Sequence, residues 1–301
     1  MEGNGIEIDR DLCNGCGLCV TVCPTGTISL REGKATASGG DSIFCGHCEA
    51  VCPTEAIRIH EIDKEMSQYK TFTTEKQWLP PGKYNISLLV QLMASRRSCR
   101  HFTGQPVGRA LLEDLMKIGI TAPSGTNSQS WTFTILPQRK AVQAFAERLA
   151  SFFERLNATA EKTLLRTFLK LIGKGELDAY YRGYYRKVKE ALEEWHVSGN
   201  DRLFHGSTAA ILVGSRPGSS CPAEDALLAT QNILLAAHSM GLGSCLIGYA
   251  VAAMKRDSSI QRSIGIPAGE EIHAVIAIGY PNEVYQRIAG RKKVTPRYFE
   301  G

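Results

Sequence analysis

Hydrophobic residues along the last two-thirds of the chain recur with two different periods, one typical of helices and one typical of strands. From Ser87 onward, Leu88, Leu89 and Leu92 fall on one face of a helix, and residues 131–136 alternate as a strand does. The same rhythms predict helices over residues 109–118 and 222–240, and strands over 208–214, 244–247 and 272–278. Residues 139–196 are almost wholly helical in pattern, with an interruption near Gly173.

Helices separated by short buried strands predict an α+β fold, in which helices pack on a mainly antiparallel sheet. The first 62 residues differ, because three short strands near 6–8, 27–30 and 57–60 flank loops rich in cysteine. Residues 63–85 are polar and aperiodic, which is typical of a linker. We therefore expect a small domain over 1–62, a linker over 63–85 and a main domain over 86–301, with a helical insertion at 141–197.

The cysteines of the small domain are regularly spaced. Residues 13–24 read C-x2-C-x2-C-x3-C-P, the pattern with which bacterial ferredoxins hold iron–sulfur clusters. Gly15 and Gly17 let the backbone approach a cluster closely, and Pro24 turns the chain away. Zinc ligands usually form two separated pairs, and a chain of 301 residues can bury a core without disulfides. The motif therefore favours a ferredoxin-like iron–sulfur domain over a zinc site or a disulfide knot.

Residues 42–53 repeat this motif at a constant offset of 29 residues. In such a pair, the fourth cysteine of each motif reaches the other cluster. One [4Fe–4S] cluster is then expected on Cys13, Cys16, Cys19 and Cys52, and a second cluster on Cys23, Cys45 and Cys48.

The second motif lacks one cysteine. Ser42 stands where the repeat would place it, and a hydroxyl is a harder, weaker ligand for iron than a thiolate. The second cluster is thus a [4Fe–4S] cluster ligated by Ser42 or Asp41, a cluster with an open iron, or a [3Fe–4S] cluster. A Ser42 that merely caps a turn is a further alternative.

Composition is that of an ordinary globular protein, with 43% hydrophobic and 22% charged residues, but its charge is uneven. Residues 1–62 carry a net charge of −5, which leaves +10 on the remainder and suggests an anionic ligand or a docking surface there. No basic run with interleaved aromatic residues points to nucleic acid. The sequence has neither a membrane-length apolar run nor a leader, and its cluster thiolates need a reducing compartment. We therefore expect a cytoplasmic protein with no membrane contact.

Three stretches of the main domain carry candidate chemistry. Arg96, Ser98 and Arg100 alternate along an extended segment, so two guanidiniums and a hydroxyl can face a phosphate; alternatively they complement a helix dipole. In the polar loop 122–131, side-chain amides suit a heteroaromatic edge, although turn chemistry also explains them. Residues 241–248 imitate a dinucleotide-binding glycine motif, but they follow a helix and enter a strand, which excludes a Rossmann site.

In this order, the three stretches resemble the nitroreductase family of FMN-dependent flavoproteins. Residues 279–283 and 287–293 resemble that family's closing segment, so the resemblance covers roughly residues 86–294. With the cysteine motifs in front, the whole chain is similar to a ferredoxin–nitroreductase fusion. The resemblance implies a nitroreductase-like α+β sandwich and a homodimer with FMN at the subunit interface.

The resemblance also implies site residues. Arg96, Ser98 and Arg100 match positions that hold the FMN phosphate and ribityl chain, and Arg291 and Lys293 match a C-terminal phosphate contact. The loop that covers the isoalloxazine, supplied by the other subunit, matches Pro123, Ser124, Gly125 and Asn127. The segment along the other flavin edge matches Cys245, Leu246, Ile247 and Gly248. One departure is Ser130, where the family commonly has proline.

The helical insertion at 141–197 has two interpretations. Tyr180, Tyr181, Tyr184 and Tyr185 recur at helical spacing, as in a core helix. The alternative is a lid over the flavin that sets substrate choice. Catalysis is expected to be flavin-borne, with His205 as a candidate proton donor near the pocket.

These features predict an iron–sulfur flavoprotein oxidoreductase. An external low-potential donor, ferredoxin or similar, would reduce the clusters, the clusters would reduce FMN, and FMN would reduce an electron-poor small molecule. Nitroaromatics, quinones and activated alkenes fit that description. The alternative is an electron-transfer adaptor between ferredoxin and a partner protein, without a small substrate of its own. The physiological substrate and the direction of electron flow stay open at this point.

Overall fold

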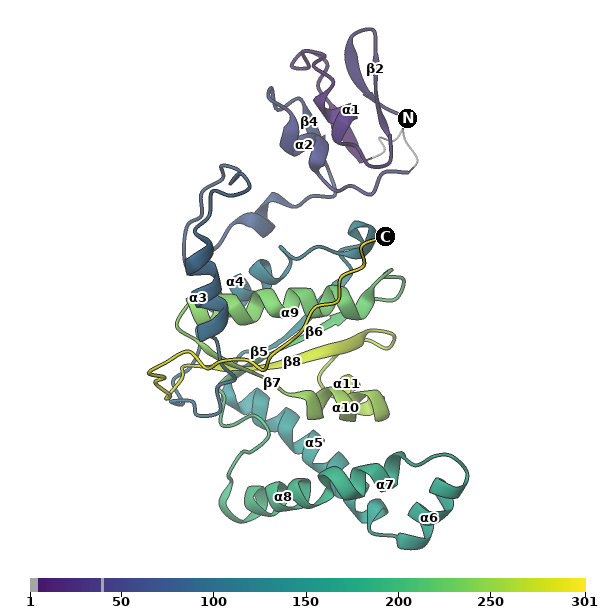
Figure 1. Cartoon of the computed structure of the whole chain (residues 1–301), viewed down its shortest axis with the longest axis vertical. Coiled ribbons are helices and arrows are strands. Elements are labelled where there is room, and N and C mark those ends of the chain that lie inside the picture. The colour runs from purple at the N-terminus through teal and green to yellow at the C-terminus, as the bar shows by residue number, and fades with distance from the viewer. Residues whose placement is uncertain (1–4, 39–40) are drawn as a thin grey trace.

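The computed structural model describes residues 5–38 and 41–301, which form a small N-terminal part and a larger body (Figure 1). The N-terminal part has one hydrophobic core and the larger body has two. The smaller core lies at the N-terminal end and includes Ile28, Ile57, Ile59 and three of the motif cysteines. The rest of the chain forms a larger body, in which one sheet lies between helices.

The N-terminal part contains two small antiparallel sheets. Strand β1 (Ile6–Ile8) pairs with β4 (Ile57–Ile59), and β2 (Ile28–Arg31) pairs with β3 (Lys34–Ala37). The three predicted strands are confirmed, whereas β3 was missed because its apolar residues are alanines, which are uncommon in strands.

The sequence repeat is also a structural repeat. Helices α1 (Leu18–Val22) and α2 (His47–Val51) each begin after a glycine in the left-handed conformation, Gly17 with φ 75° and Gly46 with φ 76°. Only glycine adopts this conformation without strain, and it starts the helix between Cys16 and Cys19 in the first motif and between Cys45 and Cys48 in the second.

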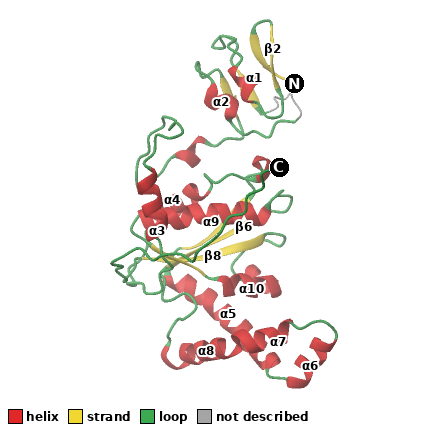
Figure 2. Ribbon diagram, viewed as in Figure 1, coloured by secondary structure: helices red, strands yellow, loops and turns green. Residues whose placement is uncertain are grey.

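The main sheet has the strand order β5-β6-β8-β7 and is antiparallel throughout (Figure 2). Its strands are β5 (Trp131–Leu136), β6 (Ala209–Ser215), β7 (Gly243–Leu246) and β8 (Glu271–Gly279). All four were predicted, and every residue of the central strand β6 is buried. The antiparallel α+β fold predicted from the apolar pattern is thereby confirmed.

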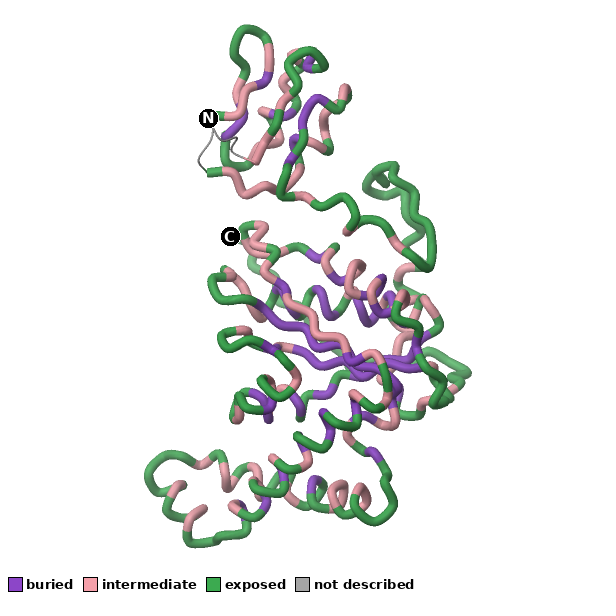
Figure 3. The backbone as a smooth tube through the Cα atoms, turned by 180° about the vertical axis from the view of Figure 1, so that it is seen from behind, coloured by how far each residue is buried: buried purple, intermediate pink, exposed green. Residues whose placement is uncertain are grey.

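Helices cover both faces of this sheet, as the buried strands in Figure 3 show. On one face, α4 (Arg109–Gly119) and α9 (Pro222–Ser239) pack with Ile211 and Val213 of β6. On the other face, α5 (Arg139–Ala160), α10 (Gly248–Arg256) and α11 (Ser258–Arg262) accompany a core that contains Leu212. Alternate residues of β6 thus enter different cores, because side chains alternate along a strand.

The helical insertion divides into a buried and an exposed part. Helix α5 buries Phe145, Leu149 and Phe153. The interpretation of the tyrosine-bearing stretch as a core helix is wrong, because no residue of 176–185 is buried and Tyr184 is exposed. Helices α6 (Thr163–Leu171) and α7 (Glu176–Tyr180) bury no residue. A π-helical turn (Tyr181–Tyr185) then leads into α8 (Arg186–Ser198), and α6 to α8 project beyond the layer formed by α10 (Figure 1).

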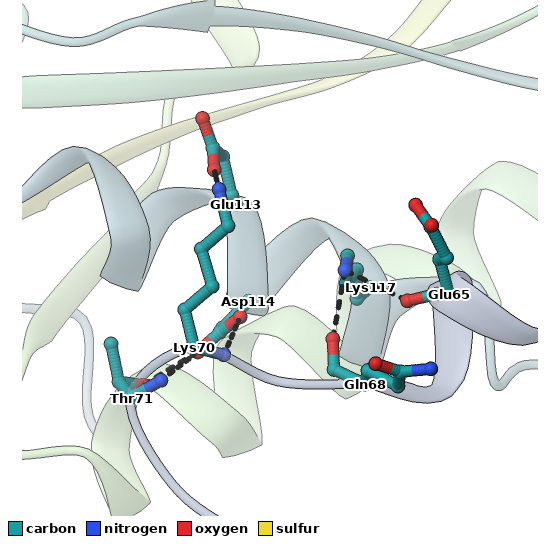
Figure 4. Close-up of polar contacts among 7 residues, drawn as sticks. All are labelled: Glu65, Gln68, Lys70, Thr71, Glu113, Asp114 and Lys117. Carbon is teal, nitrogen blue, oxygen red and sulfur yellow. Dashed lines mark hydrogen bonds and ion pairs between the residues drawn. The ribbon is translucent and has the colours of Figure 1, made fainter.

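The segment after the N-terminal part lies along α4 (Figure 4). It begins with a short 3-10 helix, η1 (Lys64–Ser67). The fully buried Asp114 accepts hydrogen bonds from Lys70 N (2.9 Å), Thr71 N (2.7 Å) and Thr71 Oγ1 (2.6 Å). One turn further, Lys117 Nζ donates to the carbonyl oxygens of Glu65 (2.9 Å) and Gln68 (2.7 Å). We call residues 64–72 the strap.

Helix α3 (Ile86–Ser95) is apolar but buries none of its residues. Ile86, Leu88, Val90 and Met93 are all exposed. The tail after β8 is exposed as well, including Val294, Tyr298 and Phe299. In the ranges that the structure describes, no helix has both the length and the apolar character needed to cross a membrane.

Candidate functional site

Three arginines meet at the edge strand of the sheet. Arg96 follows α3 directly, Ser98 forms a parallel bridge with Ser244 of β7, and Cys99 N donates to Ser244 O at 3.0 Å. Gly243 permits this close approach, because a Cβ there would lie 2.8 Å from Cys99 Sγ. The extended segment predicted for residues 96–100 is therefore held along β7.

The pKa of the Cys245 thiol in β7 is influenced by side chains of the 96–100 segment. Burial raises the pKa of its thiol, while Arg100, the Ser98 hydroxyl and Arg96 act in the opposite direction. The predicted trio thus lies together beside β7, as its alternation in the sequence required.

Arg291 joins them from the C-terminal tail. The pKa of the Arg96 guanidinium is lowered by burial and then by repulsion from Arg291 and Arg97. We call Arg96, Ser98, Arg100, Cys245 and Arg291 the basic site. Lys293 lies two residues further along the exposed tail.

The basic site carries uncompensated positive charge. Among the residues that the structure describes, Arg96, Arg100 and Arg291 form no ion pair with a carboxylate. Glu283 approaches, but it accepts a hydrogen bond from the backbone N–H of Arg100 at 3.1 Å. Guanidiniums that repel one another without an acidic partner suit an anion with several oxygens, such as a phosphate.

Two histidines border the basic site. Burial and then Arg100 lower the pKa of His205, and burial and then Arg96 lower the pKa of His238. In both cases the shift favours the neutral imidazole. His205, the predicted proton donor, lies near the site; His238 was not predicted as a site residue.

The loop before β5 lies elsewhere. Its 3-10 turn η2 (Gly125–Asn127) includes Thr126 and Asn127 with left-handed φ of 51° and 55°. Asp225, buried in the first turn of α9, accepts from Gly125 N at 2.9 Å and from Ser128 Oγ at 3.3 Å. The sequence analysis missed Asp225, although an acidic residue just after Pro222 was a usable signal for a capped helix start.

Within one chain, the loop and the basic site occupy opposite ends of α9. Asp225 lies in the first turn of α9 and His238 in its last turn, and the 18-residue helix is about 27 Å long. The predicted residues Pro123, Ser124, Gly125 and Asn127 are consequently not brought to the basic site by their own chain. A site composed of both sets requires two chains.

The motif cysteines line two small cavities, one for each expected cluster. Cys13, Cys16, Cys19 and Cys52 line one of them. Cys23, Cys45, Cys48 and Ser42 line the other. The structure thus groups the cysteines as the swapped pattern predicted, with Cys52 and Cys23 each placed beside the other motif.

Hydrogen bonds surround the cysteine sulfurs. Burial opposes ionisation of Cys23, but the Thr27 and Thr25 hydroxyls outweigh it and lower the pKa of the thiol to about 6. Ala56 N donates to Cys52 Sγ at 3.3 Å, and Ala35 N donates to Cys13 Sγ at 3.4 Å. Such donors stabilise thiolates and tune cluster potentials. The donor set therefore fits iron–sulfur clusters.

Ser42 has a structural role of its own. Its Oγ accepts a hydrogen bond from Phe44 N at 3.1 Å while the residue lines the second cavity. This geometry is that of a turn cap, which was one of the alternatives for Ser42.

A larger cavity of about 1130 Å³ opens beside the end of β7. Leu246, Gly248 and Tyr249 border it on one side, and Tyr180 and Tyr184 border it from the helical insertion. Tyr180 donates to Asn157 Oδ1 at 2.7 Å, and the Tyr184 and Tyr249 rings meet edge to face at 6.1 Å. Its wall combines five aromatic residues with aliphatic ones, and Lys174, Glu176 and Arg256 supply charges.

The fold and these sites define a class: an α+β sandwich with a basic site on its edge strand, joined to a cysteine-motif domain. The family model "Nitroreductase family" matches residues 93–280, more than half of the chain. The chain belongs to the nitroreductase family. The model "4Fe-4S binding domain" matches residues 6–29, so a ferredoxin-type motif precedes that domain, as predicted.

Individual relatives are distant. The chain is 24% identical over 216 residues to the iodotyrosine deiodinase of Thermotoga neapolitana, covering 71% of this chain and 98% of that protein. A nitroreductase with bound FMN from Bacteroides fragilis has a TM-score of 0.48 at 20% identity, covering 69% of this chain and 94% of the other. A nitroreductase with bound FMN from Desulfitobacterium hafniense has a TM-score of 0.47 at 21% identity, covering 69% of this chain and 97% of the other.

Proposed function

We propose that this protein is an iron–sulfur flavoprotein oxidoreductase, which passes electrons from its ferredoxin clusters to FMN and on to an electron-poor small molecule. The observation that carries the proposal is the basic site, three guanidiniums without a carboxylate partner, in a chain that also surrounds two cavities with cysteines. When bound, the clusters carry single electrons and the flavin accepts them singly and delivers them in pairs.

In this proposal, Arg96, Arg100 and Arg291 bind the FMN phosphate, and Ser98 adds a hydroxyl donor. Residues 245–248 border one edge of the ring system, where a Cβ added at Gly248 would meet no atom within 4 Å. The loop residues Pro123, Ser124, Gly125 and Asn127 cover the ring from the partner subunit. The two relatives of known structure named above were solved with bound FMN, which is consistent with this assignment.

Three observations support a homodimer. The basic site and the loop that would complete it are separated by the length of α9, about 27 Å, within one chain. Helix α3, which leads into the basic site, exposes an apolar surface that a second copy can cover. The exposed apolar tail after β8 supplies further surface for the same contact.

The aromatic cavity beside residues 246–249 supports a small-molecule acceptor over an electron-transfer adaptor. An adaptor needs no cavity, whereas an electron-poor aromatic or conjugated compound can stack on tyrosine rings. Nitroaromatics, quinones and activated alkenes are the proposed substrate class. The Thermotoga relative is named for iodotyrosine, itself a small aromatic molecule. An external low-potential donor, ferredoxin or similar, supplies the electrons.

The proposal is tested by an anaerobic reductive titration of the purified protein, followed by optical and EPR spectra. We expect cluster and flavin signals to change together, and acceptors from the three substrate classes to reoxidise both. Reoxidation by none of the acceptors, with both signals present, would support the adaptor instead. A protein that releases no FMN on denaturation would refute the proposal.

A further inference from the structure

One of the two cysteine-lined cavities touches the loop before β5. Asn127 Nδ2 donates to Ile43 O at 2.9 Å and to Phe44 O at 3.1 Å, directly before Cys45 in the chain. Ile43 and Phe44 also line the cavity of Cys23, Cys45 and Cys48. Gln129 Nε2 donates to Asn127 Oδ1 at 3.1 Å, which fixes the orientation of this amide.

The other cavity has no such contact. Cys13, Cys16 and Cys19 belong to residues 5–38, and within the described ranges no hydrogen bond or ion pair joins that segment to any residue after 62. Within the described residues, the cavity of Cys13, Cys16, Cys19 and Cys52 thus has no polar contact with the main body, whereas the cavity of Cys23, Cys45 and Cys48 lies beside one.

The strap provides a second attachment. Asp114 and Lys117 on α4 bind residues 65–71 through backbone and side-chain groups, as Figure 4 shows. With the Asn127 contact, the ferredoxin part is held at two places on the main body. Two attachments restrict its rotation, which a flexible linker alone would allow.

We propose that the cluster site of Cys23, Cys45 and Cys48 is the exit cluster site, from which electrons leave the ferredoxin part for the flavin. Asp114 and Asn127 are positioning residues that hold the ferredoxin part against the loop 124–130. The inference rests on the proposed function. In the proposed dimer, this loop covers the partner's flavin, so each electron crosses between subunits. The exit cluster loses one electron and the flavin gains it, and the external low-potential donor replaces that electron. Two such transfers and one proton from solvent complete the reduction of the flavin.

Asp114 and its neighbour Glu113 allow a matched test in the full-length holoprotein. Asp114→Asn weakens the carboxylate that accepts the hydrogen bonds of the strap. Glu113→Gln makes the same charge change at a partly exposed ion pair with Lys70 Nζ (2.6 Å). Amide hydrogen exchange of residues 64–72 reports attachment. Flavin reduction after rapid photoreduction of the clusters reports transfer, and direct reduction of the flavin by dithionite is the reference.

We expect Asp114→Asn to speed exchange of residues 64–72 and to slow cluster-dependent flavin reduction about tenfold or more, because small misplacements of reacting groups have large effects on rate. Direct reduction by dithionite should stay at the wild-type rate. Glu113→Gln should behave as wild type, since exposed ion pairs contribute little. Should Asp114→Asn not fold, Lys117→Met loosens the strap in its place.

Two results would separate the inference from the proposed function. If the strap of Asp114→Asn exchanges faster but cluster-dependent reduction keeps the wild-type rate, positioning by the strap is wrong and the function stands. If reduced clusters never reduce the flavin of the wild-type protein, the proposed function itself fails.

Discussion

Replacing Arg96 by alanine is the most direct test of the basic site. A hydrogen bond to a charged group contributes about 1.5–3 kcal/mol, and every 1.4 kcal/mol changes a dissociation constant tenfold. The Kd for FMN should therefore rise about 10- to 150-fold. Burial and repulsion from Arg291 already disfavour the charged Arg96 in the free protein, so the apoprotein should melt no lower than wild type.

Riboflavin makes this prediction specific, because it has the same ring system without the phosphate. Arg96→Ala should weaken FMN but leave riboflavin binding nearly unchanged, as measured by fluorescence titration of the apoprotein. Arg97→Ala is the matched control for loss of a nearby positive charge, because Arg97 also repels Arg96 but alternation along the extended segment places it on the opposite side from Arg96, Ser98 and Arg100. Equal losses for FMN and riboflavin, or no loss for FMN, would refute the phosphate assignment.

Three further changes test other parts of the molecule. Ser42→Cys should supply a fourth thiolate to the second cluster and change its EPR signal and the iron content; identical spectra would mean that residue 42 is no ligand in either form. Leu88→Asp on exposed α3 should dissociate the dimer and release FMN, since burying a leucine contributes about 1.5–3 kcal/mol. Sedimentation measures dissociation, flavin absorbance measures FMN release, and Gln91→Asp is the control. An intact Leu88→Asp dimer would contradict the interface. Despite burial, hydrogen bonds from Thr71 and Lys70 lower the pKa of Asp114, so its contribution to strap stability is complete above its unfolded pKa of about 3.9 and is lost as pH falls through the lower folded pKa. Exchange of residues 64–72 should therefore rise only below about pH 4, and strap release near neutral pH would disprove this.

Local patterns along the chain were sufficient for much of this protein. Two-residue spacings identified the cluster cysteines, since a short loop around a cluster is a local structure. Alternation predicted that Arg96, Ser98 and Arg100 share one side, and apolar rhythm predicted the four strands of the main sheet. These features depend on residues that are near one another in sequence.

Long-range contacts were not visible in those patterns. Asp114 binds the strap 43 and 44 residues away, Asn127 binds carbonyls 83 and 84 residues away, and Asp225 holds Gly125 from 100 residues away. The partners are backbone groups, which every residue carries, so no sequence motif marks them. Folding buries Asp114 and Asp225, and each buried carboxylate then needs a partner. The residues of the cluster and phosphate sites were thus readable from the amino-acid order, whereas the pose of the ferredoxin part against the main body arises from packing.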